Sequence, residues 1–409
     1  MKPKAILVDV IDDETSKREA HTRLQELEYL VNTYGGIVVI KVIQRRGVPN
    51  YETYVGTGKL DEIIEIAKNE KASYLILNNI LKPGQIYNIS ERVKEAGLEV
   101  WDRVDLILKI FGKHAESTEA KLQIQLASIQ HMGPRIYGMG EELMQQTGAR
   151  GLRGGAGETN VEVMKRHLRK QEQAILKKLK HYEVIHEGHR ARRRRQNFKT
   201  IALVGYTNAG KSSILKALTG KDVYIADELF ATLDTRIGKI YDHESKTEIL
   251  MADTIGFIQD LPPDLIKAFK STLSEAIESD LILHVIDVSD PMVHMKIEVV
   301  EDILKQLKAD KKPKIYVFNK TDLVVEKVVD DNGKPPPRTS NILKAGEETA
   351  KRLGWLKEDQ KAAGAQSVST PALKKKYKKF DPIFVSVKNK ENLDVLKKLL
   401  SKKVCSKYK

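Results

Sequence analysis

The first hundred residues alternate continuous apolar runs with segments in which apolar residues recur every three or four positions. Buried strands are predicted for the apolar runs at 5–11, 36–43, 73–79 and 98–102. Helices are predicted between them, at 16–34, 60–69 and 85–96. Strands joined by helices favour a parallel sheet, so we predict a small α/β subdomain over residues 1–112.

A different pattern begins at residue 113. Residues 115–131 carry apolar side chains at helical spacing without Gly or Pro, which predicts a helix. A long, strongly charged helix is predicted from about 160 to 195, with a thin apolar stripe made by Val163, Leu168, Ile175, Leu176, Leu179 and Val184. Eight glycines lie between the two helices, from Gly133 to Gly157. We therefore predict a helical hairpin over 113–196 with a Gly/Arg-rich tip.

The tip of this hairpin has two interpretations. Glycine-rich basic loops are often plain connections between helices. Alternatively, the missing side chains let the backbone approach an RNA surface, while Arg135, Arg150 and Arg153 pair with phosphates or stack on bases. The basic stretch RARRRRQN at 190–197 then marks the boundary to the next domain, either as a solvated linker or as a second phosphate contact.

The length of the chain and the distribution of its charge indicate the number of domains and the kind of binding partner. A chain of 409 residues suits two or three domains. The net charge of +14 is concentrated in residues 133–200, with 16 Lys and Arg against 7 Asp and Glu, and in residues 373–409, with 13 against 3. Such blocks favour a polyanionic partner, nucleic acid before an acidic membrane surface. Lysine tails that only maintain solubility are the alternative.

The number of cysteines and the length of the apolar runs bear on where in the cell the protein is expected to be. Cys405 is the single cysteine, which excludes an intrachain disulfide and a cysteine-rich zinc site. The sequence holds no run of about 18 apolar residues that would predict a membrane-spanning helix. We expect a monomeric, cytoplasmic protein without stable membrane association, and the lysine tail leaves peripheral contact with a membrane open.

The segment GYTNAGKSS, residues 205–213, follows a short apolar strand and precedes a helical segment. A glycine, four residues and then Gly-Lys-Ser is the spacing of a phosphate-binding loop. Gly205 and Gly210 let amide groups point at phosphates, Lys211 neutralises the β- and γ-phosphates, and Ser212 ligates Mg²⁺. The nucleotide contacts predicted here are Gly205, Tyr206, Thr207, Asn208, Ala209, Gly210, Lys211, Ser212 and Ser213.

Another glycine-lysine segment, YVGTGKLDEI at 54–63, also resembles a phosphate loop. It lacks the four-residue spacing and the following Ser or Thr. A tight turn that enters a helix explains this segment as well.

The segment LMADTIGF, residues 250–257, is a second apolar strand that ends in Asp253. A carboxylate at this position would hold Mg²⁺ through water, and the N–H of Gly256 can meet the γ-phosphate. Thr254 and Ile255, which lie between them, complete the predicted contacts of this segment.

A threonine is needed to close over Mg²⁺ and the γ-phosphate, and LFATLDTR at 229–236 offers two. We favour Thr232 over Thr235, with Phe230 and Ala231 beside it as nucleotide contacts. The loop would be ordered by GTP and released after hydrolysis. The catalytic candidates are Lys211, Thr232 and Gly256, and the Mg²⁺ ligands are Ser212, Thr232 and, through water, Asp253.

The segment IYVFNKTDL, residues 315–323, selects the base. Asp322 can accept hydrogen bonds from N1–H and N2–H₂ of guanine, whereas adenine lacks the exocyclic donor and would leave the carboxylate unpaired. Asn319 orients the loop and contacts N7, and Lys320 lies along the base. A second loop would reach guanine O6 through its backbone. The predicted base contacts are Asn319, Lys320, Thr321, Asp322, Ser386, Val387 and Lys388, which makes GTP and GDP the ligands.

Together these segments resemble the HflX-type GTPases, which belong to the TRAFAC class. The likeness covers most of residues 1–325, and the stretches that carry it are YVGTGKLDEI, VWDRVDLILKIF, STEAKLQIQLA, RGGAGET, GYTNAGKSS, LFATLDTR and DTIGFIQDLPPDLIKAF. The resemblance implies an α/β fold in which an N-terminal α/β subdomain and a helical hairpin precede a Ras-like G domain with a mostly parallel sheet, here 197–409.

The resemblance also implies a function. It implies GTP hydrolysis stimulated by ribosomes and binding to the large ribosomal subunit near the peptidyl transferase centre, with the hairpin loop at rRNA. Bacterial members act as ribosome splitting or rescue factors. The alternatives are an RNA-binding or ribosome-assembly protein in which GTP gates or only stabilises the fold, and a membrane-surface signalling GTPase held by the lysine tail.

Three departures from the family pattern stand out. The hairpin loop GARGLRGGAGET lacks the proline of a Gly-Arg-Gly-Pro-Gly loop, and Ser386-Val387 replaces the usual Ser-Ala. Residues 328–380 form a Pro-, Lys- and Ala-rich stretch that we expect to be a mobile surface insertion.

Phe257 stands where many GTPases have a glutamine that orients water. A phenyl ring cannot polarise water, so we expect slow intrinsic hydrolysis. Asn208 is a candidate ligand for K⁺, a role that asparagine has at this place in some GTPases, where the ion neutralises charge in the transition state.

The K⁺ hypothesis makes a direct prediction. Hydrolysis of GTP should be faster in KCl than in NaCl at equal ionic strength, because only the fitting cation would neutralise the developing charge. Phosphate release measured in both salts tests this, and equal rates would remove Asn208 as a K⁺ ligand.

Overall fold

The computed structural model describes residues 2–131, 160–196, 198–220, 229–230, 236–242, 247–259, 265, 270–324, 374–375 and 377–405. Several predicted features lie outside these residues. They are the hairpin tip with Arg135, Arg150 and Arg153, the segment with Ala231, Thr232 and Thr235, and residues 328–373 of the expected insertion.

The N-terminal unit is built on a parallel four-stranded sheet with the order β2-β1-β3-β4. Its strands are β1 Lys4–Ile11, β2 Ile37–Arg45, β3 Tyr74–Leu77 and β4 Glu99–Asp102. Its helices are α1 Lys17–Tyr34, α2 Thr57–Glu70, α3 Pro83–Val93, the short η1 Lys94–Ala96 and α4 Arg103–His114. The predicted strand–helix alternation is confirmed. The segment at 54–63 forms the turn that leads into α2 and the first part of that helix.

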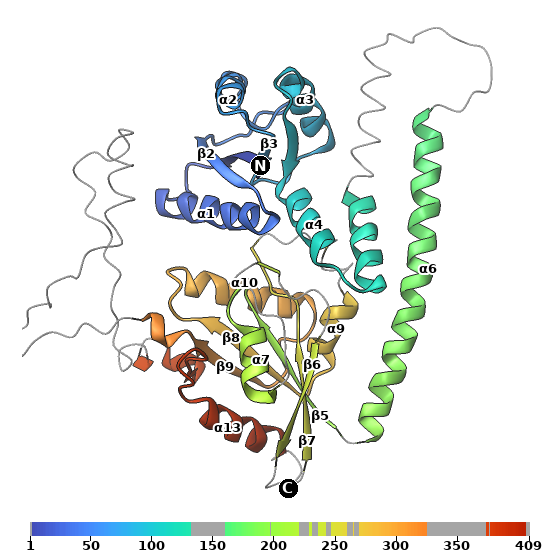
Figure 1. The fold of residues 1–409 in the computed structure, drawn as a ribbon, viewed down its shortest axis with the longest axis vertical. Helices are drawn as coiled ribbons and strands as arrows, with labels where there is room; N and C mark the ends of the chain where they lie inside the picture. The colour runs from blue at the N-terminus through green and yellow to red at the C-terminus, as the bar shows by residue number, and fades with distance from the viewer. Residues whose placement is uncertain are drawn as a thin grey trace, which may run out of the picture.

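Helices cover both faces of this sheet, which is why its central strands β1 and β3 are almost entirely buried and mostly apolar. Leu60 of α2 and Ile89 of α3 pack on one face. Leu27 of α1 and Ile107 of α4 belong to the core on the other face. Figure 1 shows α1 and α4 between the N-terminal sheet and the second unit below it.

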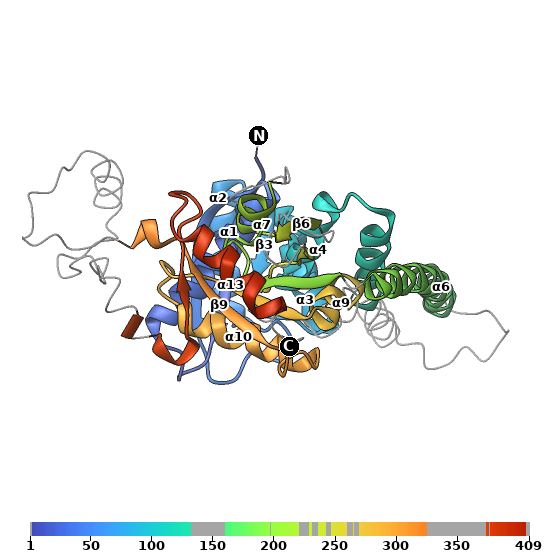
Figure 2. The same cartoon turned by 90° about the horizontal axis from the view of Figure 1, so that it is seen from below.

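The predicted hairpin is present, and its two helices run antiparallel. Residues 118–131 are helical and pack beside α6, Asn160–Arg195. Near the base of the hairpin His186 Nε2 lies 2.7 Å from Glu119 Oε2, and further along Gln130 Nε2 donates to Glu172 Oε1 at 3.0 Å. Figure 1 shows α6 as a long rod along one side of the molecule, and Figure 2 shows it nearly end-on at that side.

The apolar stripe predicted for α6 is only partly correct. Ile175 is buried and Leu179 is partly buried against the partner helix, whereas Val163, Leu176 and Val184 are exposed. The remainder of the packed face is polar, because its partners are carboxylates that accept hydrogen bonds from His and Arg side chains.

The basic stretch at 190–197 is not a free linker. It is helical to Arg195, and Arg193 forms a bidentate pair with Glu275 of α9, Lys270–Glu278, at 2.8 and 3.1 Å. Arg194 pairs with Glu278 at 3.3 Å. These arginines therefore join the hairpin to the second unit.

The second unit, the predicted G domain, is built on a six-stranded sheet with the order β10-β9-β8-β5-β7-β6. All neighbouring strands are parallel except β6 and β7. The strands are β5 Lys199–Gly205, β6 Arg236–Asp242, β7 Thr247–Asp253, β8 Leu281–Asp287, β9 Lys314–Asn319 and β10 Ile383–Phe384. The predicted α/β class with a mostly parallel sheet is confirmed.

Helices again cover both faces of the sheet. Those on one face are α7 Lys211–Thr219 and α13 Leu393–Cys405, and those on the other are α9 and α10 Val293–Gln306. The short helices η2 Thr321–Leu323 and η3 Lys378–Phe380 lie in the connections after β9 and before β10. Every crossover of this kind brings the carboxyl ends of the parallel strands to one edge, where ligands of such folds bind.

One cluster of buried residues runs from the N-terminal unit into the G domain. It contains Leu27 and Phe111 of α1 and α4 together with Val204, Phe230 and Phe257 of the G domain. The two units therefore share a continuous apolar core. Within the part of the chain that the structure describes, no helix is both long and apolar enough to cross a membrane.

Candidate active site

The phosphate loop connects β5 to α7, and its backbone is too close to neighbouring strands for side chains at two positions. Gly205 has φ +157°, and a Cβ there would lie 2.2 Å from the carbonyl oxygen of Val285. Gly210 has φ +91°, and a Cβ there would lie 2.3 Å from Asn319 Nδ2. Only glycine allows this approach, which fits the predicted loop.

Lys211 begins α7 and is buried under the loop. Its Nζ donates to the carbonyl oxygens of Gly205 and Tyr206, at 3.3 and 3.0 Å. Burial lowers the pKa of Lys211 to about 8, because the ammonium loses water, while the nearby Asp253 carboxylate opposes this shift. An anionic ligand would restore the preference for the charged form.

The predicted Mg²⁺ ligands Ser212 and Asp253 come together from α7 and β7. Ser212 Oγ donates to Asp253 Oδ2 at 2.6 Å, and the aspartate is fully buried. A hydroxyl and a carboxylate side by side next to a lysine are hard oxygen donors of the kind that Mg²⁺ prefers. The donor set therefore fits the ion.

The segment after β7 lies directly against the phosphate loop. Phe257 N donates to Gly205 O at 3.0 Å, and Thr207 N donates to Phe257 O at 2.8 Å. A Cβ on Gly256 would lie 2.9 Å from Thr207 Cα and 3.0 Å from Lys211 Nζ. The backbone of Gly256 thus borders the lysine that is predicted to hold the terminal phosphate.

The Phe257 side chain points away from this site into the core shared by the two units and is 1% exposed. It therefore cannot contact an attacking water molecule. The burial of Phe257 agrees with the prediction that residue 257 does not orient the attacking water. Thr254 is also buried, and its hydroxyl donates to Leu203 O at 2.7 Å.

The segments after β9 and β10, which are predicted to read the base, meet behind the phosphate loop. Asn319 Nδ2 donates to Ala209 O at 3.0 Å, and Val387 N donates to Asn319 Oδ1 at 3.4 Å. Ser386 Oγ donates to Asp322 Oδ1 at 2.7 Å. Asn319 therefore links three loops, and Ser386 orients the carboxylate predicted to read guanine.

Lys320 has φ +64°, and its Nζ forms an ion pair with Asp287 Oδ2 at 2.8 Å at the end of β8. Sequence reasoning missed Asp287. Val387 is partly buried and Lys388 is exposed. The described members of the predicted nucleotide set thus gather at one edge of the sheet, although their individual roles stay predictions.

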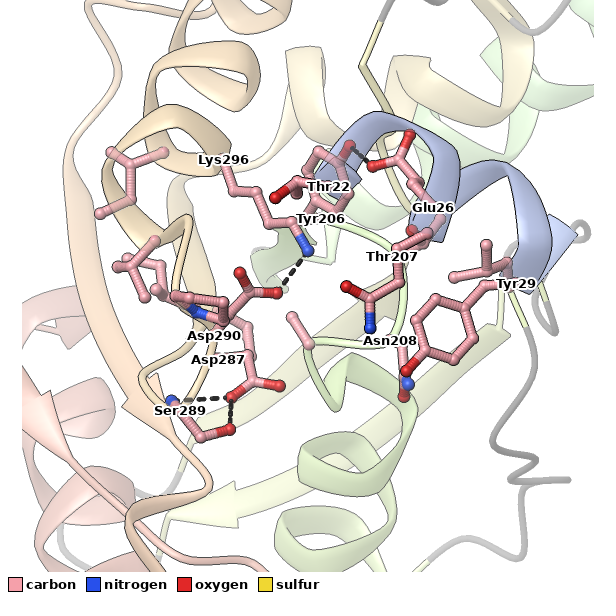
Figure 3. Close-up of a pocket in the computed structure, with 18 of the residues that line it drawn as sticks. Thr22, Glu26, Tyr29, Tyr206, Thr207, Asn208, Asp287, Ser289, Asp290 and Lys296 are labelled. Carbon is pink, nitrogen blue, oxygen red and sulfur yellow. Dashed lines mark hydrogen bonds and ion pairs between the residues drawn. The ribbon is translucent and has the colours of Figure 1, made fainter. Parts of the chain in front are cut away.

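A cavity of about 580 Å³ lies next to the phosphate loop, between α1 and the start of α10. Figure 3 shows Thr22, Glu26 and Tyr29 of α1 on one side of it and Asp290 and Lys296 on the other. Lys296 pairs with Asp290 and its Nζ lies 4.6 Å from the centre of the Tyr206 ring. Sequence reasoning assigned no role to α1 at the site, because these contacts join residues far apart in the chain.

Comparison with known proteins gives a consistent picture. Residues 21–112 match the family model described as "GTP-binding GTPase N-terminal", residues 114–193 match "GTP-binding GTPase Middle Region", and residues 200–320 match "50S ribosome-binding GTPase". The matches follow the order of the N-terminal unit, the hairpin and the G domain.

Curated relatives named "GTPase HflX" are similar over most of the chain. The protein of Caldanaerobacter subterraneus subsp. tengcongensis is 43% identical over 323 residues, which cover 79% of this chain and 73% of the relative. That of Escherichia coli is 40% identical over 74% of this chain and 70% of the relative. The structure of a GTP-binding protein from Sulfolobus solfataricus in complex with GDP is 25% identical over the full length of both chains, with a TM-score of 0.44.

The guanine assignment predicts the effect of Asp322→Asn. The amide presents a donor to the N1–H and N2–H₂ donors of guanine, and each charge-assisted hydrogen bond contributes roughly 1.5–3 kcal/mol. We expect GTP and GDP affinity to fall by at least about tenfold in titration calorimetry. Asp302→Asn, on the exposed surface of α10, is the matched control. Equal affinities in the two variants would contradict the assignment.

The lowered pKa of Lys211 predicts proton uptake on nucleotide binding. In the free protein the ammonium is about half deprotonated at pH 8, whereas bound phosphates would keep it charged. Affinity for GTP should therefore fall as pH rises above about 8, and binding at pH 8.5 should take up most of one proton. Calorimetry in buffers of different ionisation enthalpy measures this. A Lys211→Arg variant that still binds should take up none, and an equal uptake in both proteins would refute the prediction.

Proposed function

The chain belongs to the HflX family of GTPases, and on this premise we propose that it acts as a nucleotide-gated factor on the large ribosomal subunit. Family membership and the G domain support binding and hydrolysis of GTP. The observation that carries the nucleotide part is the meeting of the phosphate loop, the Ser212–Asp253 pair and the base-reading segments at one edge of the sheet.

In this proposal Lys211 exchanges its bonds to backbone carbonyls for the β- and γ-phosphate oxygens of GTP. Ser212 would ligate Mg²⁺ directly, and Asp253 would hold the ion through a water molecule. The bound ion would supply charge neutralisation between the two phosphates. In the same proposal the N–H of Gly256 donates to the γ-phosphate, and Thr232 closes over it from a segment outside the described residues. Because Phe257 is buried, intrinsic hydrolysis is slow until a partner completes the site.

The ribosomal part of the proposal is supported by the charge on the hairpin. Helix α6 carries 12 Lys and Arg residues against 4 Asp and Glu, and many of the cations are exposed, among them Arg169, Lys177, Lys178 and Arg192. Such a helix suits phosphate groups along an RNA backbone. The family model that matches the G domain carries the description "50S ribosome-binding GTPase". We extend the proposal to ribosome splitting or rescue, with the hairpin loop at rRNA.

A second candidate is an RNA-binding or assembly protein in which GTP only stabilises the fold. One observation favours it: the exposed cations of α6 lie on a helix outside the nucleotide site. RNA binding through them need not depend on the nucleotide. The two candidates differ in whether GTP controls the interaction.

Cosedimentation with purified 50S subunits separates them. We expect binding with a non-hydrolysable GTP analogue and much weaker binding with GDP, with a steep decrease as salt rises. Lys177→Gln with Lys178→Gln should lower the slope of log affinity against log salt by about one unit per lost phosphate contact. Lys68→Gln with Lys71→Gln, at the end of α2 in the N-terminal unit, is the matched control.

The outcomes are distinct. Binding that is equal with analogue, GDP and no nucleotide would favour the second candidate. If the protein bound 50S subunits in no nucleotide state and the subunits did not stimulate GTP hydrolysis, the ribosomal proposal would be refuted. The assignment of GTPase activity would not be affected.

A further inference from the structure

Two charged side chains of the N-terminal unit are buried where it meets the G domain. Arg103, the first residue of α4, forms an ion pair with Glu26 of α1, and their side chains are 3% and 14% exposed. Arg103 Nη1 also donates to Asn78 Oδ1 at 2.7 Å. A buried ion pair is costly to desolvate unless further hydrogen bonds satisfy it. The remaining partners of this pair lie in the G domain.

Those partners are Tyr206 and Gln259. The hydroxyl of Tyr206 donates to Glu26 Oε2 and accepts from Gln259 N at 2.8 Å, while Arg103 Nη2 donates to Gln259 O at 3.3 Å. Both backbone polar groups of Gln259 are therefore connected to the Glu26–Arg103 pair: its C=O directly through Arg103, and its N–H through Tyr206. Burial and the Glu26 carboxylate raise the pKa of Tyr206 well above its usual value, so the phenol keeps its donor proton. We call these four residues the interdomain clamp.

The clamp holds the part of the G domain that borders the terminal phosphate. Gln259 follows Gly256 by three residues, and Phe257 between them is hydrogen-bonded to the phosphate loop in both directions. Tyr206 itself belongs to that loop. The clamp therefore holds both the phosphate loop and the segment after β7, whose contact places the backbone of Gly256 beside Lys211.

The same two helices contact the segment that leads to Thr232. Thr33 Oγ1 of α1 accepts from Leu229 N at 3.2 Å, and the rings of Phe111 and Phe230 pack edge to face at 4.6 Å. Thus α1 and α4 hold both segments that are predicted to close over the γ-phosphate.

We propose that Glu26 and Arg103 are positioning residues for GTP hydrolysis, through which the N-terminal unit acts in cis to hold residues 256–259 against the phosphate loop. Since the Gly256 N–H is predicted to contact only the γ-phosphate, the clamp favours GTP over GDP. The inference rests on the GTPase activity and is independent of the ribosomal proposal.

The test uses Glu26→Gln in the full-length protein. The neutral amide weakens the bond from Tyr206 and leaves the buried Arg103 without its counter-charge. We expect kcat for GTP to fall about tenfold, the Kd of a non-hydrolysable GTP analogue to rise by a similar factor, and the Kd of GDP to change less than twofold. Glu28→Gln is the matched control, because Glu28 lies on the same helix, pairs with Lys41 and makes no contact in the clamp.

Tyr206→Phe is the second variant, since it keeps the buried ring and removes only the hydroxyl. It should reproduce the selective loss of analogue affinity, and the double variant should be no worse than the more affected single one, because both changes break the same connection. Folding of each variant is checked by its thermal unfolding transition.

Three results would overturn the inference. The first is a Glu26→Gln variant whose kcat and analogue affinity match those of Glu28→Gln. The second is an equal loss of GDP and analogue affinity in folded Glu26→Gln and Tyr206→Phe, which would show a merely structural contact. The third is a rise in kcat, which would mean that the clamp restrains hydrolysis. None of these readouts involves ribosomes, so failure here leaves the ribosomal proposal untouched.

Discussion

Two backbone hydrogen bonds organise the site, namely Phe257 N to Gly205 O and Thr207 N to Phe257 O. They extend the pairing of β5 and β7 beyond the ends of the strands and bring Gly256 within contact distance of Lys211. That junction places the backbone of Gly256, whose N–H is predicted to meet the terminal phosphate. Because backbone groups form this junction, it constrains side-chain identity mainly at the positions where a Cβ would not fit.

Much of the fold and of the site can be predicted from sequence because the signals are local. The alternation of apolar runs and helical stripes predicts the N-terminal sheet, since strands of a parallel sheet covered on two faces are mostly apolar. The sheet of the G domain is implied by the resemblance to the HflX-type GTPases. The glycine and lysine spacing of the loop before Lys211 and the segment that contains Asp322 predict which residues meet at the candidate nucleotide site. This works because β–loop–α connections place their loops at the same edge of the sheet. Ser212 and Asp253 meet at 2.6 Å from two such loops.

What the sequence did not reveal depends on contacts between distant parts of the chain. Glu26 and Tyr206 are 180 residues apart, and no periodicity signals that they share a hydrogen bond. The apolar stripe predicted for helix α6 is only partly correct for a related reason. Its packed face is largely charged, so an apolar stripe identifies only Ile175 and Leu179, while His186 and Arg193 pack through carboxylates on other helices. Whether a charged side chain of α6 is buried depends on which carboxylate it meets on another helix, and the sequence does not show this.

The apolar core that runs without interruption from α1 and α4 to the G domain has a consequence for how such proteins can diverge. A G domain transplanted onto another N-terminal scaffold would expose Phe230 and Phe257 to water. The two units are therefore not interchangeable modules. Recombination at the boundary between them would be penalised, and their facing surfaces should be inherited as a matched pair.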